Sequence, residues 1–94
     1  MSDDKKKVEI TIGGRVQGVG FRYYAKRSAS RYGVSGWVRN EPNGMVTAVA
    51  EGDSAAVDNF VNSLRKGPSS AKITTFDVRE GSYDGSFSSF GVKY

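Results

Sequence analysis

Residues 8–22 read VEITIGGRVQGVGFR, and this stretch decides the fold. Its first five residues alternate apolar and polar side chains, as in a half-buried strand. Glycines follow at positions 13, 14, 18 and 20. Beyond them, Phe21, Ala25 and Tyr32 recur at helical spacing, and Gly33 stands where a helix C-terminus favours glycine. The sequence therefore predicts a strand, a glycine-rich loop and a helix in immediate succession.

The glycine-rich loop has the properties of an anion site. Glycine permits positive φ and a close approach of a ligand to the main chain. The free N–H groups and positive dipole end of a helix start attract negative charge. Arg22, in the first turn, adds a planar fork of donors that matches a phosphate. A cation at this end is unfavourable for the helix itself, so Arg22 indicates function.

The loop matches neither of the two common nucleotide-binding motifs. Gly13 and Gly18 have the spacing of a P-loop, but Val19 stands where the lysine is required. Gly18 and Gly20 lack the third glycine of a dinucleotide fingerprint. We interpret the loop as a phosphate cradle built from backbone N–H groups and one arginine.

The rest of the chain predicts further strands at residues 36–40, 45–51, 72–79 and 90–94. A second helix begins after Asp53, an N-cap residue, and ends before Gly67-Pro68. Its apolar stripe consists of Val57, Phe60, Val61 and Leu64. The order βαββαβ plus a terminal strand favours an α+β domain, with two helices on one face of an antiparallel sheet.

The composition limits the possible chemistry. The 94 residues make one domain, and they include no cysteine and no histidine. Disulfides, thiolate or imidazole metal ligands and imidazole bases are thereby excluded. The net charge is +4, and residues 10–40 contain six basic residues and no acidic one. Such a field raises the local concentration of a small anion.

The domain is expected at residues 8–94, preceded by a disordered N-terminal tail at residues 1–7. No apolar run approaches the ~20 residues that span a bilayer, and the start lacks the apolar centre of a signal peptide. We therefore expect a cytoplasmic protein without a membrane partner.

The run from Gly14 to Arg22 resembles the active-site loop of the acylphosphatases, which hydrolyse carboxyl–phosphate bonds. A second match, Gly36-Trp37-Val38-Arg39-Asn40, is similar to that family's strand with its catalytic asparagine. Further similarity extends over residues 8–94. The resemblance implies a ferredoxin-like βαββαβ sandwich with a short C-terminal strand. It also implies a monomer that needs neither metal nor cofactor.

The resemblance implies a role for each matching residue. Arg22 would bind the phosphoryl oxygens, and Asn40 would orient the attacking water. The phosphate-binding loop would act through its backbone N–H groups, at Gln17, Gly18, Val19, Gly20, Phe21 and Arg22. The expected ligands are a small acyl phosphate as substrate and inorganic phosphate as product or competitor. We also consider an ion pair between Arg22 and the terminal carboxylate of Tyr94.

Two other functions compete with this reading. Small basic βαββαβ domains include the RRM type of RNA-binding module, but that type needs stacking aromatics on its central strands. Here Tyr23 and Tyr24 fall on the predicted first helix, so we expect no nucleic-acid partner. A phosphate-binding domain without turnover is the second alternative.

Overall fold

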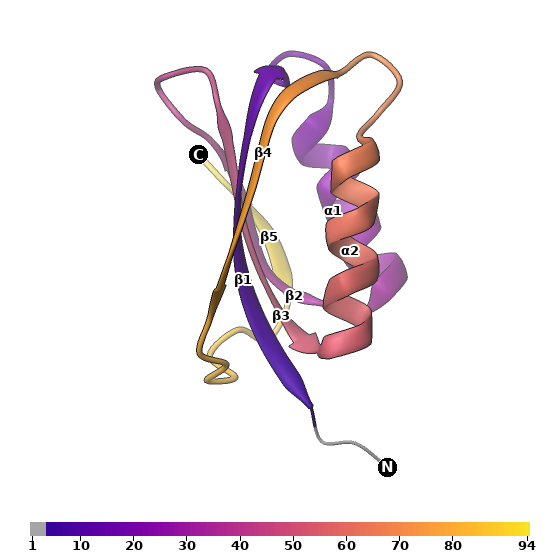
Figure 1. The fold of residues 1–94 in the computed structure, drawn as a ribbon, viewed down its shortest axis with the longest axis vertical. Helices are drawn as coiled ribbons and strands as arrows, with labels where there is room; N and C mark the ends of the chain where they lie inside the picture. Colours follow the sequence, from indigo (N-terminus) through magenta and orange to yellow (C-terminus); the bar gives the residue numbers. More distant parts are fainter. Residues whose placement is uncertain (1–3) are drawn as a thin grey trace.

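The computed structural model describes residues 4–94. Its elements follow the predicted order, and their bounds are β1 (Lys5–Arg15), α1 (Phe21–Tyr32), β2 (Ser35–Asn40), β3 (Val46–Asp53), α2 (Ser54–Lys66), β4 (Lys72–Gly81) and β5 (Phe90–Lys93). The five strands form one sheet in the order β4-β1-β3-β2-β5. Both helices cover the same face of this sheet (Figure 1). The architecture is the predicted ferredoxin-like α+β sandwich.

The sheet is antiparallel over four strands and parallel at one edge. β1 pairs antiparallel with both β3 and β4, and β3 pairs antiparallel with β2. The short C-terminal strand β5 pairs parallel to β2 and makes the sheet mixed. This strand brings the C-terminus to the end of the sheet where the β2–β3 hairpin and the β1–α1 loop also lie (Figure 1). Three segments distant in sequence thus meet at one end of the molecule.

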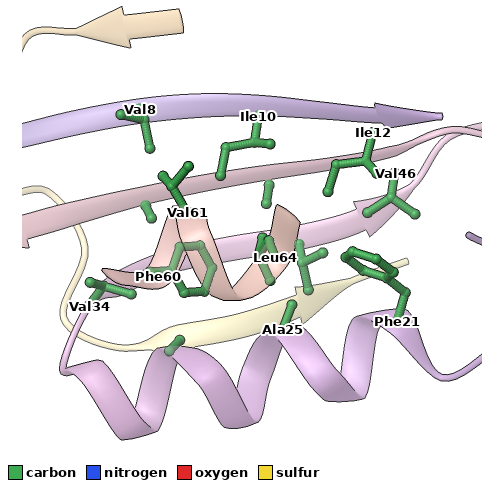
Figure 2. Close-up of a cluster of buried hydrophobic side chains, with 14 of the residues drawn as sticks. Val8, Ile10, Ile12, Phe21, Ala25, Val34, Val46, Phe60, Val61 and Leu64 are labelled. Carbon is green, nitrogen blue, oxygen red and sulfur yellow. The ribbon is translucent and has the colours of Figure 1, made fainter. Parts of the chain in front are cut away.

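The hydrophobic core lies between the helices and the sheet (Figure 2). Alternate residues of β1 point into it, and Val8, Ile10 and Ile12 are buried. The predicted stripe of α2 is buried as expected, and the Phe60 ring meets the Phe90 ring edge-on at 5.5 Å between centroids. The Phe60–Phe90 contact joins α2 to β5, so the core itself holds the C-terminal strand in place.

The N-terminal part of the domain differs from the prediction. β1 begins at Lys5, so residues 5–7 are not a disordered tail. The pairing of β1 with β3 continues to Lys5 opposite Asp53, and Lys5 Nζ donates to Asp53 Oδ1 at 2.6 Å. Asp53 does precede α2 as its N-cap residue, but its side chain makes no capping hydrogen bond. The remaining part of the predicted tail, residues 1–3, lies outside the described residues.

Candidate active site

The loop between β1 and α1 turns sharply at two glycines. Gly18 has φ 74° and Gly20 has φ 79°, both in the left-handed region. A Cβ atom at either position would meet no atom within 4 Å, so the loop is open on that side. Gly20 is the N-cap residue of α1, and no side chain of residues 4–94 makes a capping hydrogen bond at this helix start. In the described part of the chain, the N–H groups of residues 17–20 make no hydrogen bond with another protein group.

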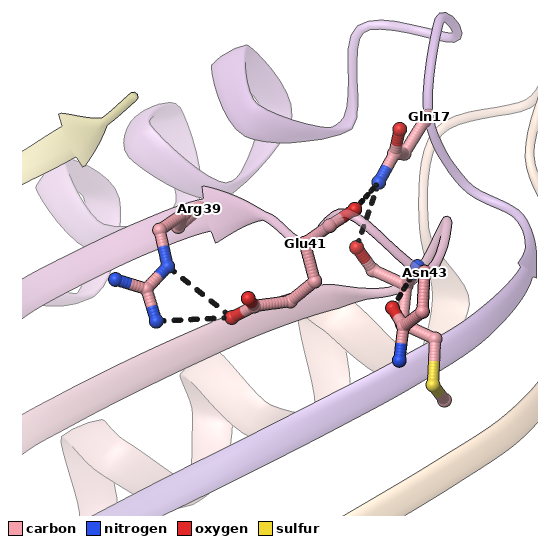
Figure 3. Close-up of polar contacts among 5 residues, drawn as sticks. Gln17, Arg39, Glu41 and Asn43 are labelled. Carbon is pink, nitrogen blue, oxygen red and sulfur yellow. Dashed lines mark hydrogen bonds and ion pairs between the residues drawn. The ribbon is translucent and has the colours of Figure 1, made fainter.

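The Gln17 side chain fastens this loop to the β2–β3 hairpin. Its Nε2 atom donates to the carbonyl oxygens of Glu41 at 2.8 Å and of Met45 at 2.9 Å (Figure 3). Sequence reasoning assigned Gln17 only a backbone role and missed this clamp. The partners are main-chain carbonyls that lie 24 and 28 residues further along the chain. Contacts from a side chain to distant main-chain carbonyls cannot be predicted from residue type or spacing.

Arg22 lies in the first turn of α1 with its guanidinium group free of acidic partners. No ion pair involves Arg22 among residues 4–94. Its guanidinium carbon lies 5.0 Å from the centroid of the Tyr94 ring. The ion pair that we considered between Arg22 and the Tyr94 carboxylate is therefore not formed, and the aromatic ring makes the contact instead. A cation over an aromatic face keeps all of its N–H donors for a ligand.

Asn40 ends β2 opposite Val46 and carries an unsatisfied polar atom. Its Oδ1 atom is buried and has no hydrogen-bond partner among residues 4–94. Leaving a buried acceptor unpaired costs about 1–3 kcal/mol, so native proteins rarely tolerate it without a reason. Asn40 also lines a cavity, and an unpaired acceptor on such a residue is a candidate for a hydrogen bond from a bound molecule.

The residues of the two motifs meet around one cavity of about 350 Å³. It is lined by Val16, Gly18, Gly20, Phe21, Arg22, Tyr23, Lys26, Asn40, Val92 and Tyr94. The structure thus brings together Arg22, Asn40 and three of the predicted loop residues. Gln17 and Val19 do not line the cavity, since Gln17 holds the hairpin and Val19 packs against the core. Among residues 4–94, no acidic side chain lines the cavity, whereas Arg22 and Lys26 each bring a positive charge to it.

The carboxylate next to Asn40 in the chain is neutralised outside the cavity. Glu41 Oε2 accepts hydrogen bonds from Arg39 Nε at 3.2 Å and Nη2 at 3.1 Å (Figure 3). A hydrogen bond from the Thr47 side chain, and then the bonds and charge of Arg39, hold the pKa of Glu41 below its ordinary value. Glu41 therefore stays ionised at neutral pH and pairs with Arg39.

Other kinds of site find no support in the described residues. The central strands β1 and β3 carry no aromatic residue, and Tyr23 and Tyr24 lie on α1. The aromatic sheet face of an RRM is therefore missing. Within residues 4–94 no cluster of three or more His, Cys, Asp or Glu side chains is placed to bind a metal ion. None of the helices described is both long and apolar enough to cross a bilayer.

Comparison with known proteins identifies a family for this chain. Residues 8–92 match the Acylphosphatase family model. An acylphosphatase of Nocardioides sp. is 53% identical over 97% of this chain and 91% of its own length. An acylphosphatase of Methylococcus capsulatus is 48% identical over 93% of this chain and 95% of its own. The crystal structure of acylphosphatase from Bacillus subtilis is similar with a TM-score of 0.90 and 35% identity, over 95% of this chain and 99% of that one.

Proposed function

This chain belongs to the acylphosphatase family, and we propose that it hydrolyses acyl phosphates by direct attack of a water molecule held by Asn40. The phosphoryl group is bound by Arg22 and by the N–H groups of the β1–α1 loop. The observation that carries this proposal is the Asn40 Oδ1 atom. It is a buried acceptor without a partner in the described part of the chain, on a residue that lines the same cavity as Arg22.

The loop and Arg22 suit a phosphoryl group. The unpaired N–H groups of residues 17–20 and the uncapped start of α1 offer donors and a positive dipole end to the phosphoryl oxygens. The Arg22 guanidinium adds up to five N–H donors in a fixed plane. Charge that grows on the equatorial oxygens during phosphoryl transfer is stabilised by donors already in place.

Asn40 supplies the orientation of the nucleophile. Its amide oxygen accepts a hydrogen bond from water and so fixes the direction of the water's lone pair. An amide does not take up a proton in the neutral range, and the chain has no histidine or cysteine. The proton of the attacking water therefore passes to a phosphoryl oxygen of the substrate. The products are a carboxylate and inorganic phosphate.

The leaving group explains why no general acid is needed. The carboxylate that departs has a conjugate acid with a pKa near 4 to 5, by analogy with side-chain carboxyls. It is a stable anion at neutral pH and leaves without protonation. We propose that positioning and electrostatic stabilisation by this chain's own groups carry the reaction, with no metal ion or cofactor.

The test is the hydrolysis of benzoyl phosphate, followed by absorbance with EDTA present. The Asn40→Ala variant should lose about 10²-fold or more in kcat, because the water is no longer held in line. It should unfold at the same temperature as the wild type or higher, since the substitution removes a buried unpaired oxygen. The matched control is Asn43→Ala in the hairpin turn, where Asn43 Oδ1 accepts from the Met45 N–H outside the cavity.

Each outcome of this test has a definite meaning. Normal kcat in Asn43→Ala together with the loss in Asn40→Ala supports the assigned role of Asn40. An Asn40→Ala variant that is folded and fully active would overturn the mechanism. A folded wild type without turnover that still binds inorganic phosphate would favour a phosphate-binding domain instead. A strict need for added metal would refute the metal-free reaction.

A further inference from the structure

The active-site cavity is larger than the phosphoryl group that the loop binds. If each of five heavy atoms takes the ~30 Å³ of a liquid water molecule, a phosphate occupies roughly 150 Å³. The cavity measures about 350 Å³. More than half of it therefore remains for the acyl part of the substrate. The residues around that remaining space determine which acyl groups fit.

A second cation, Lys26, lines this cavity one helical turn beyond Arg22. Residues four apart lie on the same side of a helix, with Cβ atoms about 5–6 Å apart. Long side chains on a helix lean toward its N-terminus, so Lys26 is directed over the turn that begins at Arg22. Among the described residues Lys26 has no acidic partner. Its charge is free to meet a ligand.

The two cations differ in the geometry that they offer. Arg22 presents a rigid planar fork, and its guanidinium carbon lies 5.0 Å from the centroid of the exposed Tyr94 ring. Lys26 is a point charge on a flexible four-carbon stem that can follow anions at different positions. The walls beside them are Val92 and the exposed rings of Tyr23 and Tyr94. This surrounding suits an apolar acyl body that ends in a negative charge.

We infer that Lys26 forms a second anion subsite, so that the enzyme prefers acyl phosphates whose acyl group carries a further negative charge. Carboxylate-bearing and phosphorylated acyl groups both belong to this class. The inference rests on the proposed function, because the first anion must be the phosphoryl group at Arg22. Lys26 is a specificity residue here, and the reaction at phosphorus does not require it.

The experiment compares two substrates that differ only in charge. These are 4-carboxybenzoyl phosphate and its amide counterpart, 4-carbamoylbenzoyl phosphate, and their ratio of kcat/KM is measured in wild type and Lys26→Met. A partly exposed ion pair is worth about 0.2–1 kcal/mol, so the ratio should fall about 1.4- to fivefold in the variant. In the charge-reversed Lys26→Glu variant it should fall further. In wild type the preference should weaken as ionic strength rises.

Arg31→Met is the control for net charge. It removes one positive charge from the last turn of the same helix, and Arg31 does not line the cavity. The substrate ratio should stay at the wild-type value in this variant. Since both Lys26 and Arg31 lie on the exposed side of a helix, the three variants are expected to fold.

The outcomes separate this inference from the proposed function. If Lys26→Met slows both substrates equally, Lys26 acts on the phosphoryl group and the second subsite does not exist. If Arg31→Met lowers the ratio as much as Lys26→Met, only the overall field matters and the inference is wrong. If the wild type hydrolyses neither these substrates nor benzoyl phosphate, the proposed function fails first.

Discussion

The Gln17 clamp gives the sharpest test of how this structure builds its site. Gln17→Met keeps the size of the side chain and removes both donated hydrogen bonds, to the carbonyls of Glu41 and Met45. A hydrogen bond of this kind contributes about 0.5–1.5 kcal/mol net. Each carbonyl retains one backbone donor, Gly44 N–H for Glu41 and Glu41 N–H for Met45. Two such bonds together contribute about 1–3 kcal/mol. No acceptor is left unpaired in the variant, so the loss of stability should lie in the lower half of that range, at about 1–2 kcal/mol.

This loss is measurable by thermal unfolding. For a domain of this size, 1 kcal/mol corresponds to about 4–8 °C in Tm, so Gln17→Met should unfold about 5–15 °C lower. The loop that carries the phosphate N–H groups should also shift relative to Asn40. A misplacement of about 1 Å can cost 10²-fold, so kcat/KM for benzoyl phosphate should fall about 10- to 100-fold. Inhibition by inorganic phosphate should weaken as well.

A second substitution at position 17 tests whether the two carbonyl oxygens require a hydrogen-bond donor there. Gln17→Glu replaces the two N–H donors with a carboxylate that faces two carbonyl oxygens, so it should be more damaging than Gln17→Met at neutral pH. Part of the stability should return as the pH falls, because the protonated acid can donate one hydrogen bond. Wild-type Tm and kinetics in Gln17→Met would refute the reasoning that the clamp positions the loop.

Three further predictions concern the framework around the site. Gly36→Ala should destabilise the fold by about 3 kcal/mol or more in urea unfolding. Gly36 has φ 146°, and a Cβ atom there would overlap the Val49 carbonyl. The control Gly91→Ala should be nearly neutral, because a Cβ atom at position 91 would meet no atom within 4 Å. The lowered pKa of Glu41 means that its ionised form stabilises the fold above its ordinary pKa of 4.5. Wild type should therefore be more stable than Glu41→Gln at pH 7, and this difference should vanish in urea titrations as the pH falls through the pKa of the folded state. Phe60→Ala should cost about 3–5 kcal/mol by the same assay, since Phe60 is fully buried.

Local patterns in the sequence predicted most of the fold. The end of α1 was predicted from the glycine at position 33, because glycine favours the left-handed conformation at a helix C-terminus. Gly33 does adopt this conformation, and its N–H donates to the carbonyl of Ala29. The stripe of α2 was predicted because burial follows its helical period. The start of β1 was not, because Lys5 and Lys6 are held by Asp53 and Asp58, which lie about fifty residues away. Runs of charge carry no local signal of such partners.

The candidate site likewise contains features that local sequence patterns predict and features that depend on distant residues. The glycines, Arg22 and Asn40 stand in recognisable runs, so their assembly around one cavity could be anticipated. The clamp of Gln17 and the ring contact of Tyr94 depend on which loops meet at one end of the sheet. Lys26 is a further case, since an exposed helix lysine is ordinary until a cavity is found beside it.

The hairpin explains how two motifs far apart in sequence can act on one reaction. The bonds from Glu41 N–H to the Met45 carbonyl and from Gly44 N–H to the Glu41 carbonyl close this turn internally. The Gln17 side chain then attaches the loop to a hairpin that is already closed by these two hydrogen bonds, directly beside Asn40. In the proposed mechanism the loop sets the position of phosphorus, and Asn40 sets the position of the water. Their separation is therefore fixed through Gln17, and loosening it should weaken phosphate binding and slow turnover together. Loss of Asn40 should slow turnover alone, so the two variants distinguish holding the substrate from aligning its attacker.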